Sequence, residues 1–94
     1  MSDITVRIPA PLRRLTNGED RVTVGGASLE TVIASLNEAY PGIKARLCDD
    51  DGALRNFVNV YINGEDVRFL QGLATSTKAG DEVSIIPAVA GGSL

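Results

Sequence analysis

The stretch RVTVGGASLETVIASL, residues 21–36, contains the transition that decides the fold. Val22 and Val24 alternate with polar neighbours, which is the period of a half-buried strand. Gly25-Gly26 interrupts that strand, and Ser28 can accept a hydrogen bond from a free backbone N–H at the start of a helix. Apolar residues then recur at the spacing of one helical face: Leu29, Val32, Ile33 and Leu36. The stretch therefore predicts a strand followed by an amphipathic helix.

Residues before this stretch complete a β-hairpin. The segment 3–8, DITVRI, alternates apolar and polar residues, and Pro9 and Pro11 help to end it. The segment 16–20, TNGED, contains Asn and Gly, which tolerate the positive φ of a tight turn. The segments 3–8 and 21–24 are therefore expected to pair as antiparallel strands.

The second half of the chain predicts three further strands. The helix should end near Tyr40, because Pro41 and Gly42 follow. A polar connection is expected over 43–56. After it we expect a strand at 57–62, an Asn63-Gly64 turn and a return strand at 67–69, followed by a loop at 72–77 and a last strand at 83–86. The tetrapeptide NGED occurs at both 17–20 and 63–66, which we interpret as turn chemistry used twice.

The order β-β-α-β-β-β predicts an α+β protein of the β-grasp, or ubiquitin-like, fold. In this fold a mixed sheet carries one main helix on one face. Residues 1–86 are expected to form the domain and residues 87–94 a flexible tail with a Gly-Gly motif.

Side-chain parity predicts which residues face the helix. The inward set is Ile4, Val6, Ile8, Val58, Val60, Ile62, Val83 and Ile85. Phe57, Tyr61 and Ile86 should share the outer face with the polar Asn59 and Ser84. Three apolar side chains on an open face indicate a partner surface, although scattered exposed apolar residues are also common.

The composition narrows the classes of function. The chain has 94 residues and a net charge of −3, without the basic footprint of a nucleic-acid binder. No apolar run is long enough to span a membrane, and no signal peptide is visible. The single cysteine, Cys48, favours a reducing compartment, so we expect a cytoplasmic protein. With no histidine, the chain lacks the commonest general base and metal ligand. The sequence therefore predicts a carrier, subunit or binding module, with no catalytic residue and no bound metal or cofactor.

The tail, PAVAGGSL at 87–94, carries the chemistry. Ala90, Gly91 and Gly92 have no side chain beyond a methyl group, so they can pass through a narrow channel. An enzyme that brings a glycine carboxylate to the α-phosphate of ATP needs such a slim chain. A terminus that merely contains small residues is the alternative interpretation.

The chain resembles the MoaD/ThiS family of ubiquitin-like sulfur carriers, and within it the carriers that serve cysteine synthesis. The specific part of the resemblance lies in residues 57–92, with the runs GDEV at 80–83 and PAVAGG at 87–92. Supporting cues are Ile8-Pro9, Leu12-Arg13, Tyr40-Pro41-Gly42-Ile43, Asp66-Val67-Arg68-Phe69 and Gly72-Leu73-Ala74-Thr75.

This resemblance implies a mechanism and a set of partners. An E1-like enzyme would use ATP to adenylate the carboxylate of Gly92, and a sulfur donor would convert the adenylate to a thiocarboxylate. The sulfur would pass to an activated serine derivative on a cysteine synthase-like enzyme, and a JAMM-type metalloprotease would release the cysteine. Family carriers commonly end at the second glycine, whereas Ser93-Leu94 follow here. We therefore expect a metalloprotease to cut between Gly92 and Ser93.

Two other functions fit the same tail. One is a protein modifier joined through Gly92 to lysines, and the other is the small subunit of molybdopterin synthase. The sequence names neither the sulfur donor nor the acceptor.

Other candidate residues carry less weight. The run DDDG at 49–52 departs from the spacing of a calcium loop, so a solvated turn is expected. Cys48 could be a reactive thiol, but nothing in the neighbouring sequence indicates a lowered pKa. Arg13-Arg14 is too short for a nucleic-acid patch, and Arg68 and Lys78 are either partner contacts or solvated side chains.

Overall fold

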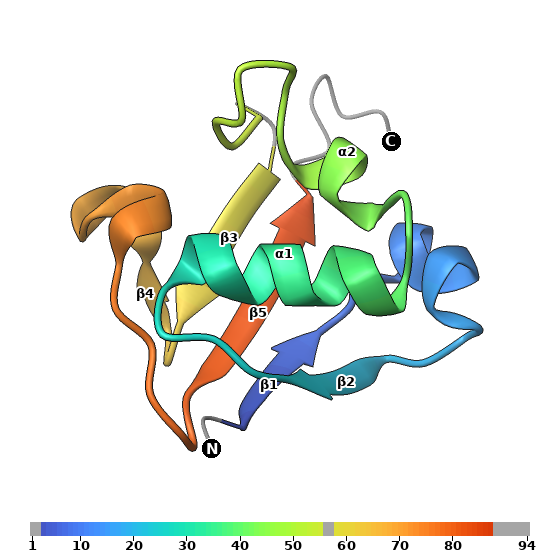
Figure 1. The fold of residues 1–94 in the computed structure, drawn as a ribbon, viewed down its shortest axis with the longest axis horizontal. Coiled ribbons are helices and arrows are strands. Elements are labelled where there is room, and N and C mark those ends of the chain that lie inside the picture. Colours follow the sequence, from blue (N-terminus) through green and yellow to red (C-terminus); the bar gives the residue numbers. More distant parts are fainter. Residues whose placement is uncertain (1–2, 56–57, 88–94) are drawn as a thin grey trace.

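A five-stranded mixed sheet forms the centre of the molecule in the computed structural model, which describes residues 3–55 and 58–87 (Figure 1). The strand order is β2-β1-β5-β3-β4. The strands are β1 (Ile4–Arg7), β2 (Arg21–Val24), β3 (Val58–Ile62), β4 (Glu65–Asp66) and β5 (Glu82–Pro87). β1 and β5 are parallel, and the other neighbours are antiparallel. This arrangement confirms the predicted β-grasp fold.

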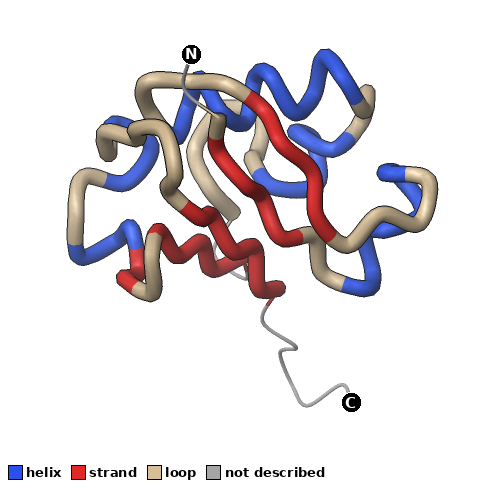
Figure 2. The backbone as a smooth tube through the Cα atoms, turned by 90° about the horizontal axis from the view of Figure 1, so that it is seen from below, coloured by secondary structure: helices blue, strands red, loops and turns tan. Residues whose placement is uncertain are grey.

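The predicted main helix is α1 (Leu29–Ala39), which crosses the front of the sheet in Figure 1. It begins at Ser28, whose hydroxyl accepts a hydrogen bond from the N–H of Thr31 at 3.3 Å. Figure 2 shows the twist of the sheet from a second direction. Gly26 lets the connection from β2 approach the helix, because a Cβ there would lie 2.8 Å from Cγ2 of Val32.

The core lies between the helices and one face of the sheet. All eight residues of the predicted inward set are buried, as are the four apolar residues of the α1 face. The parity prediction is therefore confirmed for the inner face. β5 extends one residue beyond the predicted strand at each end.

The prediction of a polar connection over 43–56 is wrong at its start. A short helix, α2 (Ile43–Leu47), forms there, and both Ile43 and Leu47 are completely buried. The side-chain oxygen of Asn37 accepts hydrogen bonds from the N–H groups of Gly42 and Lys44, both at 3.1 Å. Burial of two large side chains stabilises a helix too short to form alone.

The predicted return strand at 67–69 is also wrong. β4 ends at Asp66, whose carboxylate accepts a hydrogen bond from the N–H of Arg68 at 2.9 Å and starts the 3-10 helix η2 (Val67–Phe69). Val67 is buried in the core instead of continuing a strand. Two further 3-10 helices were not predicted: η1 (Ala10–Thr16) between β1 and β2, and η3 (Gly72–Ala74) in the expected loop.

Both NGED segments, 17–20 and 63–66, begin with an Asn-Gly pair that forms a tight turn. Asn17 and Gly18 have φ values of 57° and 84°, and Asn63 and Gly64 have 52° and 90°. The first pair ends η1, whereas the second joins β3 to β4. Because both residues of each pair have positive φ, Asn and Gly are the residue types that adopt this backbone most easily.

Candidate partner-binding site

The face of the sheet opposite α1 presents a row of side chains that crosses all five strands. The strand register aligns them directly: Arg21, Arg7, Ser84, Tyr61 and Asp66. Both arginines are exposed, while Tyr61, Ser84 and Asp66 are half-buried. The row is therefore basic at the β2 edge and acidic at the β4 edge.

Two of the three predicted patch residues lie on this face. Ile86 is 48% exposed, and its register partner on β3 is Asn59. Tyr61 is two residues further along β3, so it is a diagonal neighbour of Ile86 on the same face. Phe57 lies outside the described residues. The structure thus brings Tyr61 and Ile86 together, in a patch that also contains polar side chains.

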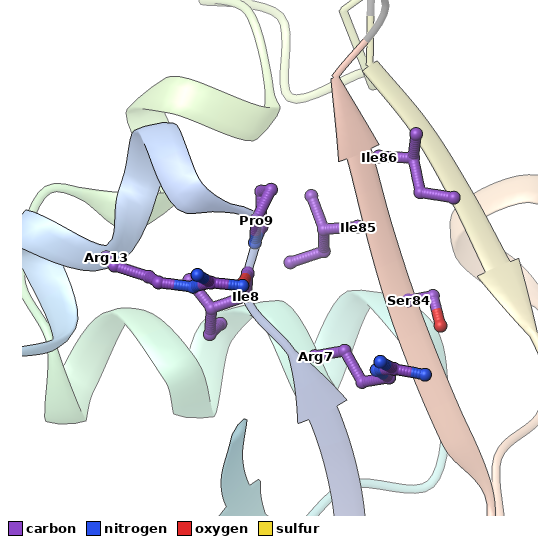
Figure 3. A pocket seen from close by; sticks show the side chains of 7 residues that line it. All are labelled: Arg7, Ile8, Pro9, Arg13, Ser84, Ile85 and Ile86. Atoms are coloured by element: carbon purple, nitrogen blue, oxygen red, sulfur yellow. The ribbon is translucent and has the colours of Figure 1, made fainter. Parts of the chain in front are cut away.

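An open pocket of about 360 Å³ lies between η1 and the end of β5 (Figure 3). Its lining consists of Arg7, Ile8, Pro9, Arg13, Ser84, Ile85 and Ile86. In Figure 3, Arg7 extends along the sheet toward Ser84, whereas Arg13 reaches back from η1 to Ile8. The pocket combines an apolar floor with two guanidinium groups.

Arg13 is oriented by its own backbone. Its Nε donates a hydrogen bond to the carbonyl of Ile8 at 3.0 Å, which holds the guanidinium at the pocket that Arg13 lines. Among the hydrogen bonds of the described residues, neither Arg7 nor Arg21 has an acidic side-chain partner. Sequence reasoning assigned Arg13 no role and did not single out Arg7 or Arg21. Their proximity becomes visible only once the strand register and the path of η1 are known.

Arg68, a candidate partner contact from the sequence, has a structural role. Its guanidinium donates to the side-chain oxygen of Asn59, to the carbonyl of Val58 at 2.7 Å and to the carbonyl of Arg55 at 3.0 Å. These bonds fix the start of β3 against the turn after β4. Lys78 is exposed, and its backbone N–H donates to a carboxylate oxygen of Asp81 at 2.9 Å.

Asp81 is the most deeply buried carboxylate among the described residues, at 6% exposure. The side-chain N–H of Asn63 donates to it at 3.0 Å, and this bond, with that from the Lys78 N–H, lowers the pKa of Asp81. The other side-chain atom of Asn63, Oδ1, accepts from the N–H of Glu82 at 3.0 Å. Asn63 therefore ties the β3–β4 turn to the start of β5.

The remaining candidates have local explanations. Cys48 is buried, and burial raises the pKa of its thiol, which makes the reactive thiolate less available. The carboxylate of Asp49 accepts hydrogen bonds from the N–H groups of Asp51 and Ala53, at 2.9 and 3.2 Å, and so closes its own turn. Within the described ranges, no group of acidic or cysteine side chains is arranged to hold a metal ion.

Sequence reasoning missed one exposed apolar feature. Phe69 is 88% exposed and Leu70 is 39% exposed, at the end of η2. The prediction of a return strand had placed Phe69 in the sheet. The signal for the correct structure was Asp66, a residue type that caps short helical turns.

The predicted chemical residues Gly91, Gly92 and Ser93 lie outside the described residues. The described chain reaches Pro87 at the end of β5, and Ile85 and Ile86 of that strand line the pocket. The pocket, with Arg7 and Arg13, therefore lies beside the end of β5.

Comparison with known proteins identifies the family. The model of the ThiS family matches residues 6–92, which includes the second half of β1 and all of the other four strands, and which ends at Gly92. The chain belongs to the ThiS family. A relative of this ThiS-family protein is the sulfur carrier protein CysO of Mycobacterium tuberculosis, 50% identical over 92 residues, covering 96% of this chain and 99% of the relative.

Two more relatives describe the range of the family. The structure of the BexX/CysO complex of Amycolatopsis orientalis contains a chain with a TM-score of 0.90 and 47% identity, covering 95% of this chain and 99% of that one. Small archaeal modifier protein 3 of Haloferax volcanii is 43% identical over 74 residues, covering 79% of this chain and 74% of the relative. The ThiS-family chain is thus a CysO-like protein with the ubiquitin-like fold.

None of the helices in the described part of this ThiS-family chain has the length and apolar character needed to cross a membrane.

Proposed function

We propose that this protein carries sulfur as a thiocarboxylate on Gly92. The observation that carries the proposal is the family match, which extends through the β-grasp domain and ends at Gly92. The similarity to CysO, a sulfur carrier protein, over nearly the whole chain supports the same role. The protein acts as a co-substrate and supplies no catalytic residue of its own.

The chemistry begins with the peptide bond that joins Gly92 to Ser93. A JAMM-type metalloprotease hydrolyses this bond with one water molecule and frees the Gly92 carboxylate. An E1-like enzyme transfers AMP from ATP to that carboxylate and releases pyrophosphate. A sulfur donor then displaces AMP, which leaves one sulfur in place of one oxygen. ATP is bound by the partner enzyme.

The carrier itself must bind the activating enzyme and place its C-terminal glycine in the active site of that enzyme. Tyr61 and Ile86, together with Phe57, are proposed to form the docking patch for the activating enzyme. Gly91 and Gly92 add no side chain beside the reacting carbon. Because β5 stays paired with β3 as far as Pro87, the sheet fixes the position from which the following residues continue.

The proposed acceptor is a cysteine synthase-like enzyme in the cytoplasm, on the strength of the similarity to CysO. A relative has been solved in complex with BexX, so a carrier of this fold can be seated on a second protein.

A second candidate function is protein modification through Gly92. The 43% identity to a small archaeal modifier protein favours it. Carrier and modifier share the adenylate, and they differ in whether sulfur or a lysine amine takes the glycyl group.

Intact-mass measurement on protein from the native host tests the proposal. We expect chains that end at Gly92, of which a fraction has one oxygen replaced by sulfur. Conjugates on a denaturing gel that disappear in a Gly92→Ala variant would instead support the modifier. A stable complex with a molybdopterin synthase large subunit, with the thiocarboxylate used inside it, would favour the third function.

Ile86→Asp is expected to weaken binding to the activating enzyme without unfolding the domain. Burial of an apolar side chain contributes about 1.5–3 kcal/mol, so the Kd should rise about tenfold or more. Ala34→Asp is a matched control, because it adds the same charge at an exposed position of α1, on the other side of the sheet. A folded Ile86→Asp protein that is bound and adenylated like wild type would show that the patch lies elsewhere.

A further inference from the structure

Three arginines gather at one corner of the outer sheet face. Arg7 on β1 and Arg21 on β2 are direct register partners, and both are exposed. Arg13 lines the same pocket as Arg7 and is held there by its hydrogen bond to the Ile8 carbonyl. The corner therefore presents guanidinium groups from β1, β2 and η1.

This grouping opposes the stability of the sheet. Like charges directly opposite on neighbouring strands are destabilising. The remaining pairs of this hairpin avoid the conflict, since Thr5 faces Thr23 and the other two pairs are apolar. Glu82 of β5 lies on the same face two residues from Ser84, which makes it a diagonal neighbour of Arg7, but no acidic side chain is hydrogen-bonded to these arginines among the described residues. A local rule that is broken in this way is expected chiefly at functional or strained positions, and the two exposed arginines show no backbone strain.

We propose that Arg7, Arg13 and Arg21 receive carboxylates of an acidic segment on the protein that docks against the outer face. This proposal rests on the proposed function, because it specifies the chemistry of the activating enzyme's contact surface. Guanidinium groups bind carboxylates through paired hydrogen bonds, and the Nε anchor of Arg13 sets the direction in which its terminal nitrogens donate.

The surroundings of the arginines favour a protein partner. The pocket floor is apolar, with Pro9, Ile85 and Ile86 beside the charged groups. A surface that alternates apolar and cationic groups matches a protein segment that carries acidic and apolar side chains. A nucleic acid partner is disfavoured because the whole chain has a net charge of −3.

The test uses the full β-grasp domain ending at Gly92 and the E1-like enzyme that adenylates it. The double variant Arg7→Glu/Arg21→Glu should raise the Kd about tenfold or more, and binding should lose most of its dependence on salt. The matched control is Lys44→Glu/Arg46→Glu, which makes the same change in net charge at exposed positions of α2. The control should bind like wild type.

Arg21→Thr separates a functional role from a structural one. It leaves Arg7 opposite a threonine and so removes the like-charge pair, so the melting temperature should stay the same or rise while binding weakens. A variant that loses both stability and binding would assign Arg21 to the fold. Circular dichroism of all variants checks that each is folded.

The outcomes distinguish this proposal from the function on which it rests. The arginine contact alone is overturned if the wild-type chain ending at Gly92 is adenylated and the Arg7→Glu/Arg21→Glu variant binds the E1-like enzyme with the same Kd as wild type. No adenylation of the wild-type chain overturns the proposed function. Saturable binding of inorganic pyrophosphate to the isolated carrier, lost in the same double variant, would assign the arginines to a small anion and overturn the protein contact.

Discussion

A chain that still carries Ser93 and Leu94 is expected to be adenylated at least about 100-fold more slowly than a chain ending at Gly92. The reason is steric and positional. With Ser93 present, the Gly92 carbonyl is part of an amide, and the carboxylate offered to ATP lies at the wrong place beside a bulkier side chain. Misplacement of a reacting group by about 1 Å can cost on the order of 100-fold in rate. Single-turnover release of pyrophosphate measures the difference.

Two controls separate the effect of tail length on the adenylation rate from the effect of side-chain size. A chain ending at Gly92 with Gly92→Ala has the correct length and one added methyl group. A chain with Gly91 and Gly92 intact but with Ser93→Gly and Leu94→Gly has a slim tail of the wrong length. We expect both to react slowly. Equal rates for the full-length and the Gly92-terminated chains would overturn the requirement for cleavage.

Asn63→Ala is expected to lower the free energy of unfolding by about 2–4 kcal/mol. Asn63 has a φ of 52°, a region that costs alanine about 1–2 kcal/mol. The substitution also removes the hydrogen bonds to Asp81 and Glu82 and leaves the buried Asp81 with one donor fewer. Urea denaturation at neutral pH measures the loss.

Asn63→Gly is the control that separates backbone strain from hydrogen bonding. Glycine adopts the positive φ without cost, so this variant should recover part of the stability. What remains lost reports the contacts to Asp81 and Glu82. Full recovery by glycine would mean that the side-chain hydrogen bonds contribute nothing to stability.

The same contacts predict a dependence on pH. The pKa of Asp81 is lowered in the folded protein, chiefly by the Asn63 hydrogen bond. A lowered folded-state pKa contributes stability that is present above the unfolded pKa, about 3.9, and is lost as the pH falls through the folded value. The stability gap between wild type and Asn63→Gly should therefore be smaller in acid than at neutral pH. A constant gap would assign no part of it to the charged form of Asp81.

Local signals explain why most of the fold was predictable. Ser28 after two glycines, Asn-Gly turns and alternating strands each depend on neighbours in the chain. They were sufficient to predict β1, β2, α1, β3 and β5, together with the residues that face the core. The two incorrect segments depended on tertiary structure. Helix α2 exists because Ile43 and Leu47 enter a core formed by other elements. Val67 fits the alternating pattern of a strand, but in the structure it is the first residue of the 3-10 helix η2 and is buried there.

The candidate site was only partly predictable for the same reason. Parity was enough to place Tyr61 and Ile86 on the outer face. The arginine corner requires the pairing of β1 with β2, the pairing of β1 with β5 and the return of η1 to Ile8. Arg68 shows the opposite case. It is an exposed arginine in sequence terms, yet backbone carbonyls occupy its guanidinium.

The central position of β5 determines when the protein can fold during its synthesis. β5 is the strand that joins the β1–β2 hairpin to the β3–β4 hairpin, and it is the last of the described elements to be made. Until residue 87 has left the ribosome, the two hairpins have no common sheet and the apolar faces of both remain uncovered. Contacts between such distant parts of a chain also form slowly. A nascent chain that stops early therefore offers a partner neither a folded face nor a glycine end, so only a completed molecule can be loaded.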